Sequence, residues 1–320
     1  MVYEAFLTAI TDRLQQELGD TYQIRIRKIP KNNGVILDGL CIHAPNFPMS
    51  PAIYLNSYFE QYKTGMSVES VIQDILSLYR NTAIPADLAD TNLSNLDLYR
   101  SKIMFKLIHA ESNALLLEDV PHIPYLDLAI VFYLYLDRSV SGQMTALIHT
   151  EHMKRWNLKV GQLWKLALAN TPLYFPASIQ NMTEMLKQIA RKNWGEDYNE
   201  ARIEALLTEE EPESPLYILS NQHGLNGACC MLYRNILKDF ADSIGMDLII
   251  LPSSIHEVLI TPNLPGASYE DLSLLVTTIN QREVPLEDQL SNQVYLYTRA
   301  DDRIRIVSHA PSKVGAAAAH

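Results

Sequence analysis

The segment from Leu248 to Pro262, LIILPSSIHEVLITP, constrains the local fold more strongly than any other stretch of the sequence. Two apolar runs rich in Ile, Leu and Val flank a short polar stretch, a pattern that favours strand, turn, strand. Ser254-x-x-Glu257 also matches a helix capping box. A helix there would meet Pro262 within two turns, where proline cannot continue it. We therefore expect strands at about 248–251 and 258–261, joined by a polar turn.

This polar stretch holds the densest set of reactive side chains in the chain, and its members are the catalytic candidates: Ser253, Ser254, His256 and Glu257. Neighbouring side chains on a strand point to opposite faces. His256 and Glu257 can therefore serve one site only if His256 lies in the turn itself. The simpler interpretation is that the serines bond the turn backbone and that Glu257 makes a structural contact.

Helical and strand patterns alternate along the rest of the chain. Helical spacing or start signals occur at 6–18, near Pro51, from Ser67, at 160–168 (before Asn170 and Pro172), at 177–191, at 226–244 and from Ser268. Strand patterns occur at 21–29, 35–44, 103–109, 126–136, 145–149, 215–220, 293–299 and 303–307. Strands mostly neighbour strands, which predicts an α+β fold of mostly antiparallel sheets with flanking helices, in two or three subdomains.

Polar, irregular stretches suggest where those subdomains end. Ala83–Ser94 is one such boundary, and an acidic linker at Glu196–Ser214 is the other. We expect an N-terminal unit at 1–82, a central unit at 95–192 and a C-terminal unit at 215–310. The last residues, 311–320, resemble a tail left by cloning and are excluded from site reasoning.

Composition narrows the class of protein. With 48% hydrophobic and 20% charged residues, the chain has the balance of a globular protein. It has no apolar run of roughly 20 residues, and its start lacks the pattern of a signal peptide. Three cysteines are an odd count that fits a reducing compartment. We therefore expect a cytoplasmic protein without a membrane segment.

The net charge of −11 is uneven, because eight acidic residues and a single basic one lie within 196–214. The basic residues contain one pattern of interest, paired arginines on two predicted strands: Arg25 and Arg27, and Arg303 and Arg305. These pairs could contact phosphates, although edge strands also carry outward bases simply to stay unpaired. Nucleic acid is thus a disfavoured partner that the sequence leaves open.

Metal and cofactor motifs are absent from the sequence. His149 and His152 frame a His-Thr-Glu-His run, which matches neither established zinc pattern. We read it as a strand end that runs into a helix, and we expect no metal and no cofactor. The sequence also has no P-loop and no G-x-G-x-x-G or G-x-S-x-G motif.

Several longer segments carry a family resemblance: YLNSYFEQYKTG, FKLIHAESNALLLEDVPH, LALANTPLYFPASIQNM, YILSNQHGLNGACCMLY, ILPSSIHEVLITP and LSNQVYLYTR. Over about residues 1–300 the chain resembles the Firmicute domain-of-unknown-function family 5688, and its middle segments are distantly similar to the YtpQ-like family, also of unknown function. The resemblance implies a cytoplasmic bacterial protein, with relatives in gut clostridia and a link to mobile elements. It implies no activity, and it adds Asn221 and Asn226 as polar candidates for binding.

Three functions follow as hypotheses. The first is a non-enzymatic interaction or regulatory protein with an unknown protein partner, which the lack of any catalytic motif favours. The second is a hydrolase that uses the Ser253–Glu257 cluster. The third is a protein that contacts nucleic acid through its paired arginines.

Overall fold

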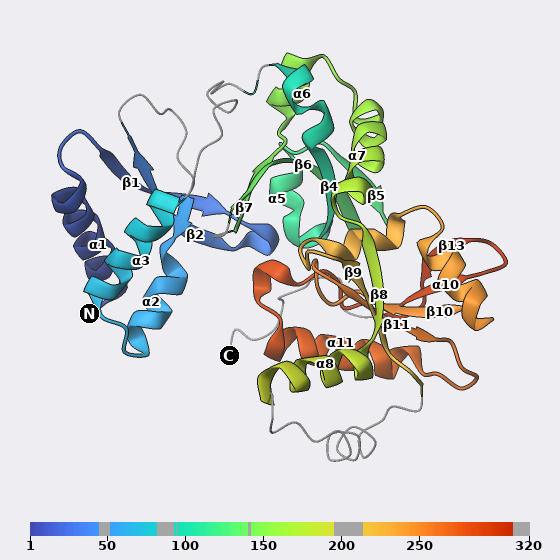
Figure 1. Ribbon diagram of the computed structural model, residues 1–320. Coiled ribbons are helices and arrows are strands. Elements are labelled where there is room, and N and C mark those ends of the chain that lie inside the picture. Colours follow the sequence, from blue (N-terminus) through green and yellow to red (C-terminus); the bar gives the residue numbers. More distant parts are fainter. Residues whose placement is uncertain (45–51, 82–92, 94, 140–141, 195–213, 310–320) are drawn as a thin grey trace. The chain divides into compact units, whose positions relative to one another are not determined.

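The computed structural model describes residues 1–44, 52–81, 93, 95–139, 142–194 and 214–309. Within these ranges the strands form three sheets, with the strand orders β1-β2-β3, β13-β12-β10-β11-β9-β8 and β4-β6-β5, and β7 also pairs with β6 (Figure 1). The chain divides into two compact units, the first of residues 1–102 and 133–158 and the second of residues 103–132 and 159–320. The boundaries that the sequence suggested for three subdomains stay a prediction.

The first unit consists of a small antiparallel sheet, three longer helices and several short elements. Its elements are α1 Tyr3–Leu18, β1 Gln23–Pro30, η1 Asn32–Gly34, β2 Ile36–His43, β3 Ala52–Tyr54, α2 Leu55–Lys63, α3 Val68–Asn81, α4 Leu96–Tyr99, η3 Arg100–Lys102, the later part of β6 (Leu128–Ser139), β7 Gly142–Leu147 and α6 Thr150–Trp156. Ser67 begins α3 as the sequence suggested, because its Oγ accepts a hydrogen bond from the backbone N–H of Ser70 at 3.1 Å.

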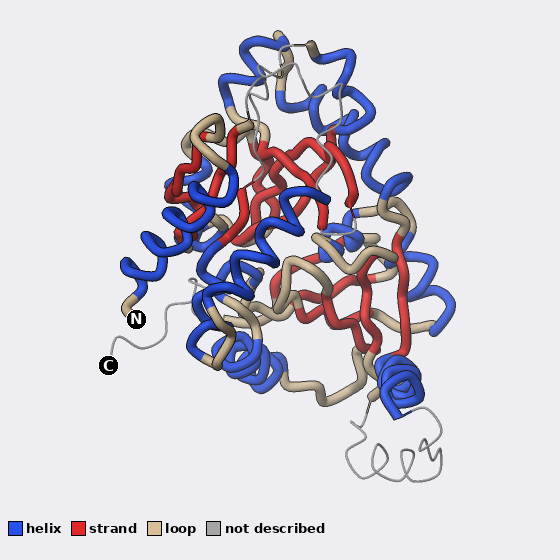
Figure 2. Tube along the Cα trace, turned by 60° about the vertical axis from the view of Figure 1, so that its left-hand side comes forward, coloured by secondary structure: helices blue, strands red, loops and turns tan. Residues whose placement is uncertain are grey.

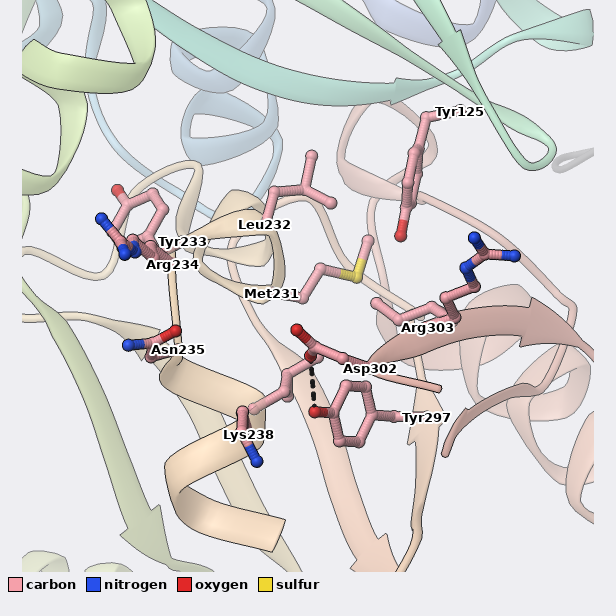
Figure 3. A pocket seen from close by; sticks show the side chains of 12 residues that line it. Tyr125, Met231, Leu232, Tyr233, Arg234, Asn235, Lys238, Tyr297, Asp302 and Arg303 are labelled. Atoms are coloured by element: carbon pink, nitrogen blue, oxygen red, sulfur yellow. Dashed lines mark hydrogen bonds between the residues drawn. The ribbon is translucent and has the colours of Figure 1, made fainter. Parts of the chain in front are cut away.

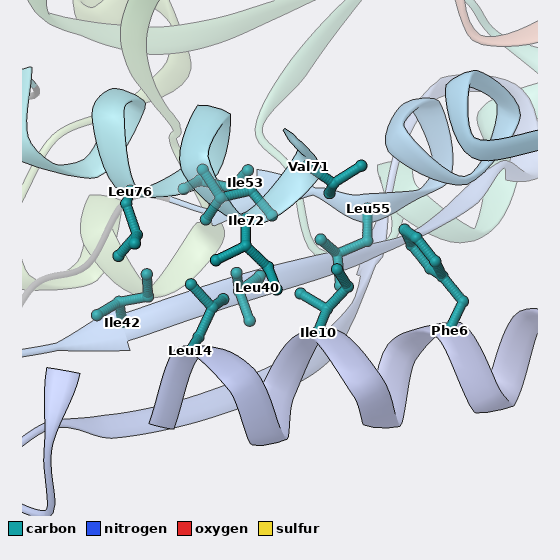
Figure 4. Close-up of a cluster of buried hydrophobic side chains, with 11 residues drawn as sticks. Phe6, Ile10, Leu14, Leu40, Ile42, Ile53, Leu55, Val71, Ile72 and Leu76 are labelled. Atoms are coloured by element: carbon teal, nitrogen blue, oxygen red, sulfur yellow. The ribbon is translucent and has the colours of Figure 1, made fainter. Parts of the chain in front are cut away.

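The core of this unit lies between the sheet and its helices. Phe6, Ile10 and Leu14 recur along α1 at the spacing of one helix face, and all three are fully buried. Figure 4 shows them facing Leu40 of β2 and side chains of α3 such as Ile72. Burial of such a stripe, at about 25 cal/mol per Å² of apolar surface, is what holds an amphipathic helix against its sheet.

The second unit contains the six-stranded sheet and the strands around β4. Its elements are β4 Ile103–His109, η4 Glu111–Asn113, α5 Ala114–Leu117, β5 His122–Tyr125, the start of β6, α7 Val160–Tyr174, β8 Ala177–Asn181, α8 Met182–Trp194, β9 Tyr217–Asn221, η6 Gly227–Leu232, α10 Ile236–Ile244, β10 Leu248–Leu251, β11 Val258–Pro262, α11 Tyr269–Glu283, η7 Leu286–Asp288, β12 Tyr295–Thr298 and β13 Arg303–Ile306.

The strand-turn-strand prediction for Leu248–Pro262 is confirmed. β10 and β11 pair in antiparallel fashion, with Leu251 opposite Leu259, and lie at the centre of the six-stranded sheet. All four residues of β10 are buried. A run that is apolar on both faces belongs in such a central position, because both faces of the strand are covered.

Three helix predictions in this unit are wrong in their extent. The predicted helix at 177–191 begins as strand β8, which pairs with β9, and becomes helical only at Met182. Helix α7 runs past Pro172 to Tyr174, because a proline near the last turn removes few helical hydrogen bonds. The predicted helix at 226–244 is split into η6 and α10, with Asn235 between them at a positive φ of 64°. Asparagine tolerates this left-handed conformation better than most residues, so it permits the break.

Both units contain helices and strands, which Figure 2 colours blue and red, and the predicted α+β class is confirmed. The antiparallel pairs are β1–β2, β2–β3, β5–β6, β6–β7, β8–β9, β9–β11, β10–β11, β10–β12 and β12–β13. Among the described residues, no helix is both long enough and apolar enough to cross a bilayer. The predicted boundary at Ala83–Ser94, the acidic linker and the tail at 311–320 lie largely or wholly outside the described residues.

Candidate functional site

The serines of the β10–β11 turn make backbone contacts. Ser254 is buried, and its Oγ accepts a hydrogen bond from the backbone N–H of His256 at 3.0 Å. The carbonyl oxygen of Ser253 accepts one from the backbone N–H of Leu290 at 3.0 Å. Serine side chains commonly stabilise turns in this way.

His256 is held by contacts on both ring nitrogens. Its Nδ1 accepts a hydrogen bond from the backbone N–H of Asn226 at 3.2 Å, and its Nε2 lies 3.2 Å from Oδ1 of Asp288. A ring that accepts at Nδ1 carries its proton on Nε2, where the Asp288 carboxylate stabilises it. Both nitrogens are therefore engaged, and neither is bonded to a serine hydroxyl.

Glu257, Asn221 and Asn226 complete the sequence candidates near this turn. Glu257 is half-buried and has no hydrogen bond or ion pair with any residue that the structure describes. Asn221 is buried and stabilises its own loop, with Oδ1 accepting from His223 N–H at 2.9 Å and Nδ2 donating to the Leu225 carbonyl at 2.8 Å. Asn226 contributes its backbone, at a positive φ of 53°, to the contact with His256.

The paired arginines lie on two edge strands. Arg25 and Arg27 are exposed on β1 in the first unit, and Arg303 and Arg305 are exposed on β13 in the second. Alternation along a strand places the two members of each pair on the same face. Of the four, Arg303 lines a pocket.

That pocket lies within the second unit and has a volume of about 640 Å³. It is formed where η6 breaks into α10, together with β5 and the β12–β13 hairpin (Figure 3). Its walls carry apolar, aromatic and charged side chains: Tyr125, Met231, Leu232, Tyr233, Arg234, Asn235, Leu237, Lys238, Tyr297, Asp302, Arg303 and Ile304. Volumes of 300–1,000 Å³ with a few placed polar groups are typical of small-molecule sites.

Basic side chains outnumber acidic ones among the residues that line the pocket, although the chain as a whole is acidic, at −11. Among its lining residues are three basic side chains, Arg234, Lys238 and Arg303, and one acidic side chain, Asp302. The hydroxyl of Tyr297 donates a hydrogen bond to Asp302 Oδ1 at 2.7 Å, and Lys238 pairs with Asp242 at 2.7 Å. Neither arginine side chain has an ion pair among the described residues. The pocket therefore suits an anionic ligand.

A second polar cluster in this unit, which we call the Asp127 cluster, consists of Asp127, His109, Ser291 and Tyr295. The Asp127 carboxylate accepts hydrogen bonds from Ser291 Oγ at 2.6 Å and from the Tyr295 hydroxyl. His109 Nε2 lies 3.8 Å from the same carboxylate. Burial, and then the Asp127 charge, raise the pKa of Tyr295 well above its usual value, so the phenol stays protonated as a donor.

The turn that presents Asp127 is strained. Leu126 and Asp127 form the two-residue connection between β5 and β6, and Leu126 has a positive φ of 55°. Two-residue hairpins favour glycine or asparagine at such a position, because a Cβ is disfavoured in this conformation. The residue with this strained backbone has an exposed side chain, since 39% of the Leu126 surface is accessible.

Replacing Leu126 by glycine should therefore raise the free energy of unfolding by about 0.5–1 kcal/mol, because it relieves the left-handed strain at little cost in packing. Urea denaturation of the full chain measures this change. Leu126→Val is the matched control, since a β-branched residue should be less stable there than leucine. Equal stabilities for Leu126→Gly and the unmodified chain would contradict the strain.

Cysteine and histidine clusters lend no support to a metal site. Within the described part of the chain, no group of three or more His, Cys, Asp or Glu could hold a metal ion. Cys229 and Cys230 are buried in η6, and burial raises the pKa of the Cys229 thiol well above its usual value. The Nδ1 of His152 accepts from the His149 backbone N–H at 2.9 Å at the start of α6, so the ring stabilises a helix end.

The sequence did not point to the pocket or to the Asp127 cluster. Arg303 was predicted only as part of a surface pair. Tyr125 of β5 and the η6–α10 residues Arg234 and Lys238 were missed, because these segments lie far from each other and from β13 in the sequence. A usable signal did exist. His109, Ser291 and Tyr295 lie inside segments that carried the family resemblance, and Asn235 interrupts an otherwise helical pattern.

Comparison with known proteins gives one match. The model of a family described as "Family of unknown function (DUF5688)" matches residues 3–299. No curated protein and no solved structure matches the chain.

Proposed function

The chain belongs to the DUF5688 family, whose function is unknown, and we propose that it is a non-enzymatic regulatory protein that binds a small anionic ligand in the pocket of its second unit. The observation that carries this proposal is the pocket of about 640 Å³ lined by Arg234, Lys238 and Arg303 in a chain of net charge −11. Arginine is well suited to bind carboxylates and phosphates, because its planar guanidinium donates two parallel hydrogen bonds.

The contacts of the β10–β11 turn support a non-enzymatic role. A serine nucleophile needs a base within hydrogen-bond reach. His256 instead accepts from the backbone N–H of Asn226 and faces Asp288 through its other nitrogen. The hydroxyl of Ser254 is bonded to backbone. These groups therefore hold a turn together, and the hydrolase hypothesis has no observation in its favour.

Calorimetric titration of the full chain with pyrophosphate at low salt tests the proposal. We expect saturable binding, and we expect Arg303→Ala to weaken it about tenfold or more, because a hydrogen bond to a charged group contributes about 1.5–3 kcal/mol. Raising the salt concentration should weaken binding further.

Arg305→Ala is the matched control for Arg303→Ala. The two arginines lie on the same strand, β13, and both are exposed, but only Arg303 lines the pocket. If the two variants weaken pyrophosphate binding equally, the pocket is not the site. A gel shift with short DNA and RNA duplexes tests the nucleic-acid hypothesis, which requires both variants to weaken binding alike.

A further inference from the structure

The pocket has two chemically different ends. Figure 3 places Arg234 and Asn235 at one side of the view and Tyr125 and Arg303 at the other, with Met231 between them. The first side is polar and cationic. The second combines an aromatic ring with a guanidinium, next to the apolar surface of Met231. A ligand with an anionic group at one end and a flat group at the other would match both sides.

The cationic end also contains the start of a helix. Asn235 precedes α10, which has nine residues, and its side chain makes no capping hydrogen bond. The backbone N–H groups of Leu237 and Lys238, both pocket residues, have no hydrogen-bond partner among the described residues. Free N–H groups at a helix start add to the attraction that Arg234 exerts on phosphate or carboxylate oxygens. Because Lys238 already pairs with Asp242, Arg234 supplies the unpaired charge there.

The other end is aromatic, with Tyr125 half-buried and Arg303 exposed. Burial raises the pKa of Tyr125 to about 12, so its phenol stays neutral and available as a donor. Its ring, the thioether of Met231 and the planar guanidinium of Arg303 are groups on which a heterocyclic base can pack. Phosphate alone makes no use of the ring or the thioether, whereas the Arg303 guanidinium can also bind a free phosphate group.

We propose that the ligand is a nucleoside phosphate, with its base packed at the Tyr125 end and its phosphates bound at the Arg234 end beside the start of α10. This inference rests on the proposed function, since it names the ligand class of the same pocket. A volume of about 640 Å³ accommodates a mononucleotide. An anion without an aromatic group would leave the Tyr125 end unfilled.

Calorimetric titrations of the full chain with four probes test this inference: adenosine 5′-diphosphate, ribose 5-phosphate, pyrophosphate and adenosine. We expect the diphosphate nucleotide to bind at least tenfold more tightly than each of the other three, because only it engages both ends. Equal affinities for the nucleotide and pyrophosphate would overturn the nucleotide assignment and leave the anion pocket standing. No binding by any anionic probe would overturn both.

Variants at the two ends separate the contributions. Tyr125→Leu keeps the bulk but loses the flat ring, so nucleotide affinity should fall about tenfold while pyrophosphate affinity stays unchanged. Tyr125→Phe keeps the ring and should bind the nucleotide within a factor of about three. Arg234→Ala should weaken binding of all three phosphorylated probes. If Tyr125→Leu weakens pyrophosphate and the nucleotide alike, Tyr125 acts through the fold and the base-packing role is overturned.

Discussion

Replacing Gly227 by alanine is expected to lower the free energy of unfolding by about 3 kcal/mol, as a severe case of overpacking. A Cβ at this position would lie 2.2 Å from Ser220 Oγ, 2.4 Å from the carbonyl oxygen of His256 and 2.8 Å from the backbone nitrogen of Asn221. Two of these three atoms belong to backbone, which cannot rotate away as a side chain can. The added methyl group must therefore displace β9 or the β10–β11 turn.

The displaced contacts are themselves stabilising. Ser220 Oγ donates to the His256 carbonyl at 2.7 Å, and Ala228 N–H, next to Gly227, donates to the Ile255 carbonyl at 3.2 Å. A buried hydrogen bond that loses its partner costs about 1–3 kcal/mol. Gly227→Ala should therefore combine overpacking with broken hydrogen bonds, and its chemical denaturation curve should shift to markedly lower urea.

Gly161→Ala is the matched control. Gly161 is the second residue of α7, its φ is not positive, and a Cβ there would meet no heavy atom within 4 Å. Alanine at such a helical position should raise the free energy of unfolding by about 0.5–1 kcal/mol. The close approach at Gly227 is contradicted if the two variants differ by less than about 1 kcal/mol.

Local patterns were enough to predict the β10–β11 hairpin. Both strands carry β-branched and apolar residues throughout, Pro262 ends the second, and Ser254 Oγ accepts the His256 backbone N–H within the polar turn between them. No distant residue is needed to choose strand over helix there. The same holds for α1, whose buried stripe of Phe6, Ile10 and Leu14 is visible as i, i+4 spacing in the sequence.

The pattern failed where distant partners decide the structure. The segment 177–181 has helical as well as strand character, and it is a strand because β9 pairs with it, with Ile179 opposite Leu219. The apolar spacing over 226–244 is continuous, so it does not reveal that Asn235 has a left-handed backbone conformation. Asn235 separates η6 from α10 and lines the pocket. Propensity is a weak guide when tertiary pairing supplies the hydrogen bonds.

The Asp127 cluster could not be predicted from the sequence for the same reason. Ser291 and Tyr295 are 164 and 168 residues away from Asp127 along the chain, so no spacing pattern connects them. An aspartate in a two-residue turn is also an ordinary turn residue. Only the packing of β5, β6 and β12 reveals that its carboxylate accepts two buried hydroxyls.

Replacing Asp127 by alanine is expected to lower the free energy of unfolding by about 3 kcal/mol, because it leaves two buried hydroxyl donors without their acceptor. Ser291 and Tyr295 are completely buried, and each donates its hydroxyl to the Asp127 carboxylate. After the substitution neither hydroxyl keeps this acceptor, and the desolvation penalty of each is no longer offset. Denaturation in urea, followed by circular dichroism, measures the loss.

A double-mutant cycle with Tyr295→Phe distinguishes this mechanism from a simple loss of packing. Phenylalanine removes the hydroxyl that Asp127 accepts and keeps the buried ring, so Tyr295→Phe alone should cost about 1 kcal/mol. In the Asp127→Ala background the same change should cost little, because the stranded hydroxyl is gone, which gives a coupling of about 1 kcal/mol between the two sites. Additive effects would show that the hydroxyl has found another acceptor. The carboxylate would then not be what holds the β5–β6 turn to the start of β12.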